Sequence, residues 1–162
     1  MRERGLTMGR LWDRWTGTKH PAAGVRPLPT LEVREALLAL NGPDAPFQVR
    51  HGFPKERADL VADRRVPELD LTVKIRMRLV PAAREVRALE EQWGNISHEY
   101  SGRQYGRGGG VMAAKTWKLE KGPDGRRRFV ETFRYSSRDM KDPLRDAVLA
   151  AGWTWRGVLL KW

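Results

Sequence analysis

The stretch LTVKIRMRLVPAAREVRALEEQW, residues 71–93, decides the fold. Apolar and polar residues alternate strictly over its first nine positions. The apolar positions are Leu71, Val73, Ile75, Met77 and Leu79. The polar positions are Thr72, Lys74, Arg76 and Arg78. A period of two is typical of a β-strand with one buried and one solvated face, so the segment is predicted to be a half-buried strand with a basic outer face.

Residues 81–93 fit two structures. Pro81 at a first helical position and the good helix formers after it fit a helix. Alternatively, residues 81–84 form a hairpin loop and residues 85–93 pair with the preceding strand. The hairpin places Glu85 and Glu91 opposite the basic face, which is a favourable cross-strand pairing of charges. We favour the hairpin for this reason, although helix propensity alone favours the helix.

The same kind of pattern predicts the elements on either side. Further strands are expected over residues 47–51, 59–66, 111–119, 128–135 and 153–162. One helix is expected from Thr30, as its cap, to about Leu40. A second is expected after Asp142, as its cap, with Pro143 at its first position. Gly102 to Gly110 (GRQYGRGGG) is expected to be a flexible loop.

Together these elements predict an α+β protein. Its mostly antiparallel sheet has about six or seven strands, either open or partly closed into a barrel. One helix precedes the sheet and one precedes its last strand. The predicted domain organisation is a loosely structured basic arm over residues 1–29, with Met1 and Met8 both fitting as its start, and a single α+β domain over residues 30–162.

The N-terminal arm contains a candidate docking segment. Leu11, Trp12 and Trp15 fall on one apolar side of a short basic helix, with Arg10 and Arg14 on its flanks. One interpretation is a helix that docks on an acidic protein or on an anionic membrane surface. The simpler interpretation, which we favour from the sequence, is an arm that folds onto its own domain.

Composition points to an anionic partner. The 162 residues contain 31 Lys and Arg against 20 Asp and Glu, a net charge of +11. A positive field attracts polyanions such as nucleic acid. Cys is absent, which excludes disulfides and zinc–thiolate sites. No apolar run is long enough to span a bilayer and no signal peptide is apparent, so a cytoplasmic protein is expected.

Basic and aromatic residues supply the candidate binding surface. The candidate polyanion-binding residues are Lys74, Arg76, Arg78, Arg103, Arg107, Arg126, Arg127 and Arg128. The candidate base-stacking residues are Tyr100, Tyr105, Trp117 and Trp155. Phosphates pair with cations and bases stack on rings, so the leading hypothesis is a non-enzymatic module that binds nucleic acid. The competing interpretation places the tryptophans in the core and the charges on an ordinary solvated surface.

An enzyme with a small-molecule site near the Gly-rich loop is the remaining alternative. Backbone amides of this loop could hold a phosphate, but Gly110 is not followed by the Lys and Ser or Thr of a P-loop. His98-Glu99 lacks the second His of a zinc-protease helix, because position 102 is Gly. We therefore predict no catalytic residue, metal site or cofactor.

Three stretches resemble a family of uncharacterised small proteins from actinobacteria. They are GRLWDRWTGTK (residues 9–19), EVRAL (residues 85–89) and PLRDAVLAAGWTWRGVL (residues 143–159). The similarity runs from about Met8 to the end of the chain, and it implies an actinobacterial cytosolic protein without carrying over any catalytic residue. The strand layout also resembles that of tubby and scramblase-like barrels, without a shared motif.

Overall fold

The computed structural model of the chain describes residues 2–94, 104–107, 113–159 and 162. Its main sheet has the strand order β1-β2-β3-β4-β5, with every neighbouring pair antiparallel. These strands are β1 (Gln48–His51), β2 (Leu60–Val66), β3 (Leu71–Val80), β4 (Glu85–Gly94) and β5 (Gln104–Arg107). A sixth strand, β8 (Thr154–Val158), runs parallel to the first half of β4, on the same side as β5. The strand β5 pairs with the last residues of β4. The predicted α+β class is confirmed.

The hairpin at residues 71–93 is confirmed, with Val80 paired to Glu85 across it. Its loop is a 3₁₀ turn over Pro81–Ala83, followed by Arg84 in the left-handed region at φ 48°. The β2–β3 connection is built in the same way, with a Pro67–Leu69 turn and Asp70 at φ 46°. Proline presets the first φ angle of each turn, so the two long hairpins share one local solution.

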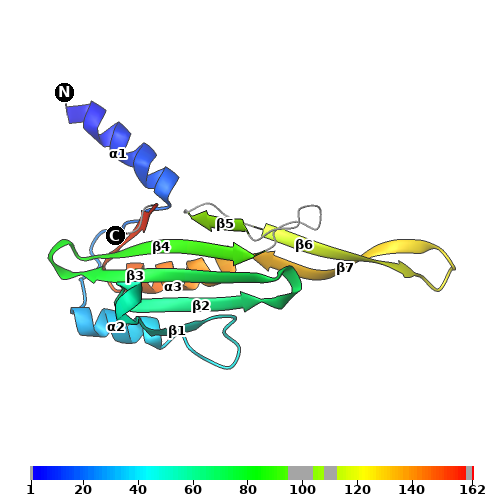
Figure 1. Cartoon of the computed structure of the whole chain (residues 1–162). Coiled ribbons are helices and arrows are strands. Elements are labelled where there is room, and N and C mark those ends of the chain that lie inside the picture. The colour runs from blue at the N-terminus through cyan, green and yellow to red at the C-terminus, as the bar shows by residue number, and fades with distance from the viewer. Residues whose placement is uncertain (1, 95–103, 108–112, 160–161) are drawn as a thin grey trace.

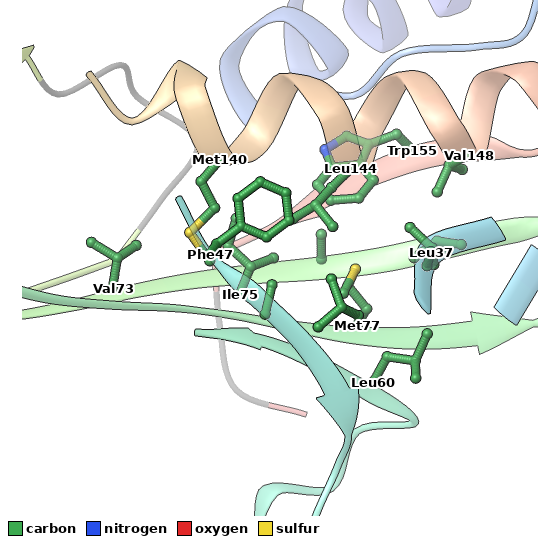
Figure 2. Close-up of a cluster of buried hydrophobic side chains, with 14 of the residues drawn as sticks. Leu37, Phe47, Leu60, Val73, Ile75, Met77, Met140, Leu144, Val148 and Trp155 are labelled. Carbon is green, nitrogen blue, oxygen red and sulfur yellow. The ribbon is translucent and has the colours of Figure 1, made fainter. Parts of the chain in front are cut away.

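Two helices cover one face of the main sheet (Figure 1). They are α2 (Thr30–Leu38) and α3 (Arg138–Ala150). Figure 2 shows Met140, Leu144 and Val148 of α3 directed toward Ile75 and Met77 of β3. These side chains are 0–1% exposed, so they form the centre of the hydrophobic core. Burial of this apolar face is the dominant stabilising contribution.

The third helix, α1 (Arg2–Thr16), projects from the body of the protein (Figure 1). It contacts β8 of the main sheet near its C-terminal end. The predicted short basic helix is confirmed, because residues 10–15 lie within α1. Its apolar side does not fold onto the domain, because Leu11, Trp12 and Trp15 are exposed. Among the described residues, no helix combines the length and the apolar character needed to cross a membrane.

Two further strands form a separate two-stranded sheet. They are β6 (Ala113–Lys121) and β7 (Arg127–Ser136), and they extend beyond the end of the main sheet (Figure 1). We call them the basic hairpin. Over the described residues, the main sheet stays open: β1 pairs with β2 alone, and no closed barrel forms.

Several predicted boundaries are wrong. The helix predicted to follow Asp142 is α3, which begins at Arg138 and contains Pro143, so Asp142 is not its cap. Its extra first turn buries Met140 and places Lys141 against Glu90, and these contacts offset the poor position of the proline. Thr30 lies inside α2 rather than at its cap, which is Pro29.

The strand prediction also needs correction. Residues 104–107 of the predicted Gly-rich loop form β5, because β4 offers them an unpaired edge. The last strand covers residues 154–158 rather than residues 153–162. The described residues thus form eight strands in two sheets, where a single sheet of about six or seven was expected.

Candidate nucleic-acid interface

The outer face of the main sheet, opposite α2 and α3, carries the predicted basic row. Alternation along β3 brings Lys74, Arg76 and Arg78 to this face, as predicted from the sequence. The side chains of Lys74 and Arg76 are only 23% and 18% exposed, because carboxylates from neighbouring segments cover them. The contacts of each cation decide how much of its charge remains for a ligand.

Lys74 belongs to a cluster centred on Glu56. The Glu56 side chain is 4% exposed and accepts hydrogen bonds from Lys74 Nζ at 2.9 Å and from Arg50 Nη1 at 2.7 Å. Arg50 Nε also bonds Asp63 at 2.6 Å. The hydrogen bond from Arg50, aided by the Phe53 amide and Lys74, outweighs burial and holds the pKa of Glu56 well below its usual range. The hydrogen bonds to Glu56 and Asp63 outweigh burial and raise the pKa of Arg50.

Arg76 is paired with a buried acid. Its Nε atom lies 2.8 Å from Oε1 of Glu91, whose side chain is 0% exposed. The N–H group does not point along this line, so the contact is an ion pair rather than a linear hydrogen bond. Arg78 packs its guanidinium 5.0 Å from the centre of the Trp162 ring and donates to the carbonyl of Arg57 at 2.7 Å.

A further cluster lies at the junction of β4 and β8. Glu85 accepts hydrogen bonds from Arg87 at 2.8 Å and from Arg156 at 2.7 Å. Burial acts to raise the pKa of Glu85, but the two arginines together hold it below its ordinary value. The predicted pairing of Glu85 with the β3 row does not occur, because Glu85 faces Val80 in the register. Glu91, in contrast, does pair with that row.

The sheet face is therefore a network of compensated charges. Most of its cations hold a carboxylate, and that bond would have to break or be shared before a phosphate could bind. The sequence showed the basic row of β3 but missed Glu56, since this acid comes from a 3₁₀ turn, Pro54–Glu56, that no periodic pattern connects to the sheet.

The basic hairpin presents a different environment. In its register Lys121 lies directly opposite Arg127, so two like charges face each other beside the turn. Both residues are exposed, as is Arg126. The nearest acid of the turn, Asp124, accepts the Arg126 amide at 3.1 Å and lies 3.6 Å from Arg128. We define Lys121, Arg126 and Arg127 as the hairpin tip. Over the described part of the chain, none of their side chains has an ion-pair partner.

Sequence reasoning identified Arg126, Arg127 and Arg128 but missed Lys121. The signal that could have found it is the turn itself, because a Lys-Gly-Pro-Asp-Gly turn places the residue before Gly122 opposite the first arginines of the next strand. Arg128 contributes less free charge than predicted, since Asp124 is close to it.

The other predicted binding residues are only partly described. Tyr100 and Arg103 lie outside the described residues, as do His98 and Glu99. The backbones of Tyr105 and Arg107 lie in β5, and that of Trp117 lies in β6 at an irregularity in the strand pairing. Trp155 is 2% exposed and packs in the core, so we do not include it in the binding surface (Figure 2).

A polar cluster of Glu90, Lys141 and Gln92 lies beside the hydrophobic core. Glu90 Oε2 is 2.8 Å from Lys141 Nζ, and Gln92 donates to Glu90 at 3.1 Å. The adjoining cavity, lined in part by Ile75 and Trp155, has a volume of about 10 Å³, which suits about one water molecule rather than a substrate. Within the described residues, no group of three or more His, Asp or Glu side chains is arranged to hold a metal ion.

The docking segment lies on α1. Leu11, Trp12 and Trp15 are 62%, 55% and 67% exposed, so they form an apolar surface separate from both the sheet face and the hairpin tip.

Comparisons with protein-family models, with curated proteins and with solved structures give no match to this chain.

Proposed function

We propose that the protein is a non-enzymatic module that binds nucleic acid and contacts its phosphates with the hairpin tip. The observation that carries this proposal is the register of β6 and β7, which sets Lys121 directly opposite Arg127. A cross-strand pair of like charges destabilises a hairpin. A phosphate group bound between the two side chains would remove the repulsion, so the tip is arranged to gain most from an anionic ligand.

The electrostatic contrast between the two basic surfaces supports the tip over the sheet face. Lys74 and Arg76 are held by Glu56 and Glu91, so an incoming phosphate competes with existing carboxylates. Arg126 has no such competitor within the described residues, because Asp124 bonds its backbone amide instead. Free, exposed cations bind polyanions with the largest gain from counterion release.

The shape of the hairpin suits a nucleic-acid groove. The nine residues of β6 span about 30 Å at the rise of a β-strand. A two-stranded ribbon fits the major groove of B-form DNA, which is about 12 Å wide. The hairpin projects beyond the main sheet, so its tip can enter a groove while the body stays outside (Figure 1). We propose duplex DNA as the ligand class, recognised chiefly through its backbone.

The experiment is a fluorescence-anisotropy titration of the full chain with a short labelled DNA duplex at near-physiological salt. The test variant is Lys121→Gln/Arg126→Gln/Arg127→Gln. The matched control is Lys19→Gln/Arg26→Gln/Lys55→Gln, which removes three exposed cations elsewhere and lowers the net charge equally. We expect wild-type and control proteins to bind with similar affinity, and the tip variant to bind at least about tenfold more weakly.

An equal loss of duplex affinity in the two triple variants would mean that binding depends only on the net charge, which would refute a site at the tip. Absence of duplex binding by the wild-type chain would refute the proposal outright. Both triple variants should unfold at wild-type temperature or slightly above it, because every substituted side chain is exposed and lacks a described ion pair.

A further inference from the structure

Helix α1 carries an apolar face that no other described segment of the chain covers. Leu11, Trp12 and Trp15 are each more than half exposed, and the two indole rings meet edge to face with their centres 5.5 Å apart. At 3.6 residues per turn, these three positions fall within about 100° of the helix circumference. They form one continuous stripe, which is unlike the scattered single apolar residues of an ordinary surface.

The helix is attached to the body by its polar side. Thr16 is 2% exposed, and its hydroxyl lies 2.8 Å from that of Thr18. Asp13 bonds His20 at 2.8 Å, and Gly157 of β8 lies directly against the Thr16 carbonyl. A surface helix normally turns its apolar stripe toward the core and its polar side to water. In α1 this arrangement is reversed, so the stripe is available to something outside the chain.

Positive charge borders the apolar stripe. Arg10 and Arg14 are exposed and lie next to it on the helix circumference, on the side of Leu11. Neither arginine has an ion pair within the described residues. The only acid between Gly9 and Thr16 is Asp13, which is engaged with His20. The chain as a whole adds a net charge of +11.

We propose that α1 is an interfacial helix that binds the surface of an anionic lipid bilayer. Tryptophan is the residue type that concentrates at the level of lipid headgroups. An amphipathic helix with Trp and Leu on one side and Arg on the other lies in that plane, and anionic lipids attract its arginines. Because α1 projects from the body, it can lie on a bilayer without first detaching from β8 (Figure 1).

The size of the stripe favours a bilayer over a protein partner. A stable protein–protein interface buries roughly 800 Å² on each side. Three side chains on two turns of one helix fall short of that area, whereas they suffice for shallow insertion between headgroups with electrostatic help. This surface is separate from the hairpin tip, so the proposal goes beyond nucleic-acid binding and stands or falls independently of it.

The test is co-sedimentation of the full chain with vesicles of phosphatidylcholine, with and without phosphatidylserine. The test variant is Trp12→Ala/Trp15→Ala, and the matched control is Leu31→Ala/Phe53→Ala, which removes two exposed apolar side chains outside α1. We expect the wild type and this control to bind the anionic vesicles, and the tryptophan variant to bind them at least about tenfold more weakly. Arg10→Gln/Arg14→Gln should weaken binding to anionic vesicles alone.

Brominated lipids report insertion directly, because they quench tryptophans that reach the acyl chains. Quenching should be seen in the wild type and be lost in Trp12→Ala/Trp15→Ala. Equal sedimentation of the tryptophan variant and its control would overturn the proposal. The proposal would also be overturned if the wild type did not bind the vesicles but formed dimers that Trp12→Ala/Trp15→Ala abolished. In that case a second copy of the chain would cover the stripe.

The hairpin-tip variant separates this proposal from the previous one. It should bind anionic vesicles as well as the control of equal charge, Lys19→Gln/Arg26→Gln/Lys55→Gln. A larger loss in the tip variant would show that the hairpin, rather than α1, provides the lipid contact and would overturn the assignment to α1.

Discussion

Arg76 and Glu91 form an ion pair across β3 and β4, with Nε 2.8 Å from Oε1 and the Glu91 side chain fully buried. Removing one partner of a buried pair leaves the other charge without compensation. We therefore expect Glu91→Gln to lower the free energy of unfolding by about 3 kcal/mol, measured by urea denaturation.

The apolar double variant Arg76→Met/Glu91→Leu tests the same pair from the other direction. Packed apolar groups can replace a buried ion pair at little cost, so this variant should be more stable than Glu91→Gln. If Glu91→Gln unfolds at the wild-type urea concentration, the pair is not a structural element and Arg76 becomes available for a ligand.

Glu56 should make the stability depend on pH in the acid range. Its folded-state pKa lies below its ordinary value of 4.5, chiefly through the hydrogen bond from Arg50. The contribution is therefore fully present above about pH 4.5 and is lost as the pH falls below it toward the folded-state value. We expect Glu56→Gln to cost about 2–3 kcal/mol at pH 7 and to flatten the loss of stability below pH 4.5.

The control for Glu56 is Glu68→Gln, which changes an exposed carboxylate on the Pro67–Leu69 turn. Thermal unfolding from pH 3 to pH 7 distinguishes the two variants. An acid profile of Glu56→Gln that parallels the wild type would show that this cluster does not govern the acid sensitivity.

Gly157 allows α1 to approach β8. A Cβ atom at this position would run into the carbonyl oxygen of Thr16, which belongs to the backbone and cannot rotate away. We expect Gly157→Ala to detach the end of α1 and to cost about 1–3 kcal/mol. Hydrogen exchange of residues 10–16 should speed up, whereas Gly42→Ala, which has open space around it, should leave exchange unchanged.

Lys121 should be a position where stability and binding change in opposite directions. Lys121→Glu replaces the repulsion of Arg127 with an attraction, so the hairpin should gain about 0.5 kcal/mol. The same change removes a phosphate contact and should weaken duplex binding. Lys55→Glu serves as the control of equal charge. If Lys121→Glu were less stable than Lys55→Glu, this would contradict the observed register.

The β3–β4 hairpin was predictable because a strict period of two along β3 fits a strand alone. At residues 81–93, the expected pairing of Glu91 with the β3 row favoured a strand over a helix, and the register agrees. The strand β5 was not predictable, since its four residues, QYGR, carry no periodic signal and form a strand against the free edge of β4. The start of α3 depends on the contact between Lys141 and Glu90, which lie 51 positions apart in the sequence (141 minus 90).

The candidate site was predictable only in part, for the same reason. Sequence shows where cations lie along a strand, but whether they remain free depends on acids that arrive from elsewhere. Glu56 reaches Lys74 from a turn 18 residues earlier, so the sheet row looked more available than it is. The hairpin tip is a local structure, and its arginines could be identified from the turn beside them.

The most direct test of binding at the hairpin tip is the salt dependence of duplex affinity. Each phosphate contact contributes about −0.9 to the slope of log K against log salt concentration. Relative to wild type, Lys121→Gln/Arg126→Gln/Arg127→Gln should make the slope shallower by about 2–3, while Lys19→Gln/Arg26→Gln/Lys55→Gln should leave it nearly unchanged. Slopes that are the same for all three proteins would contradict a phosphate-binding hairpin tip.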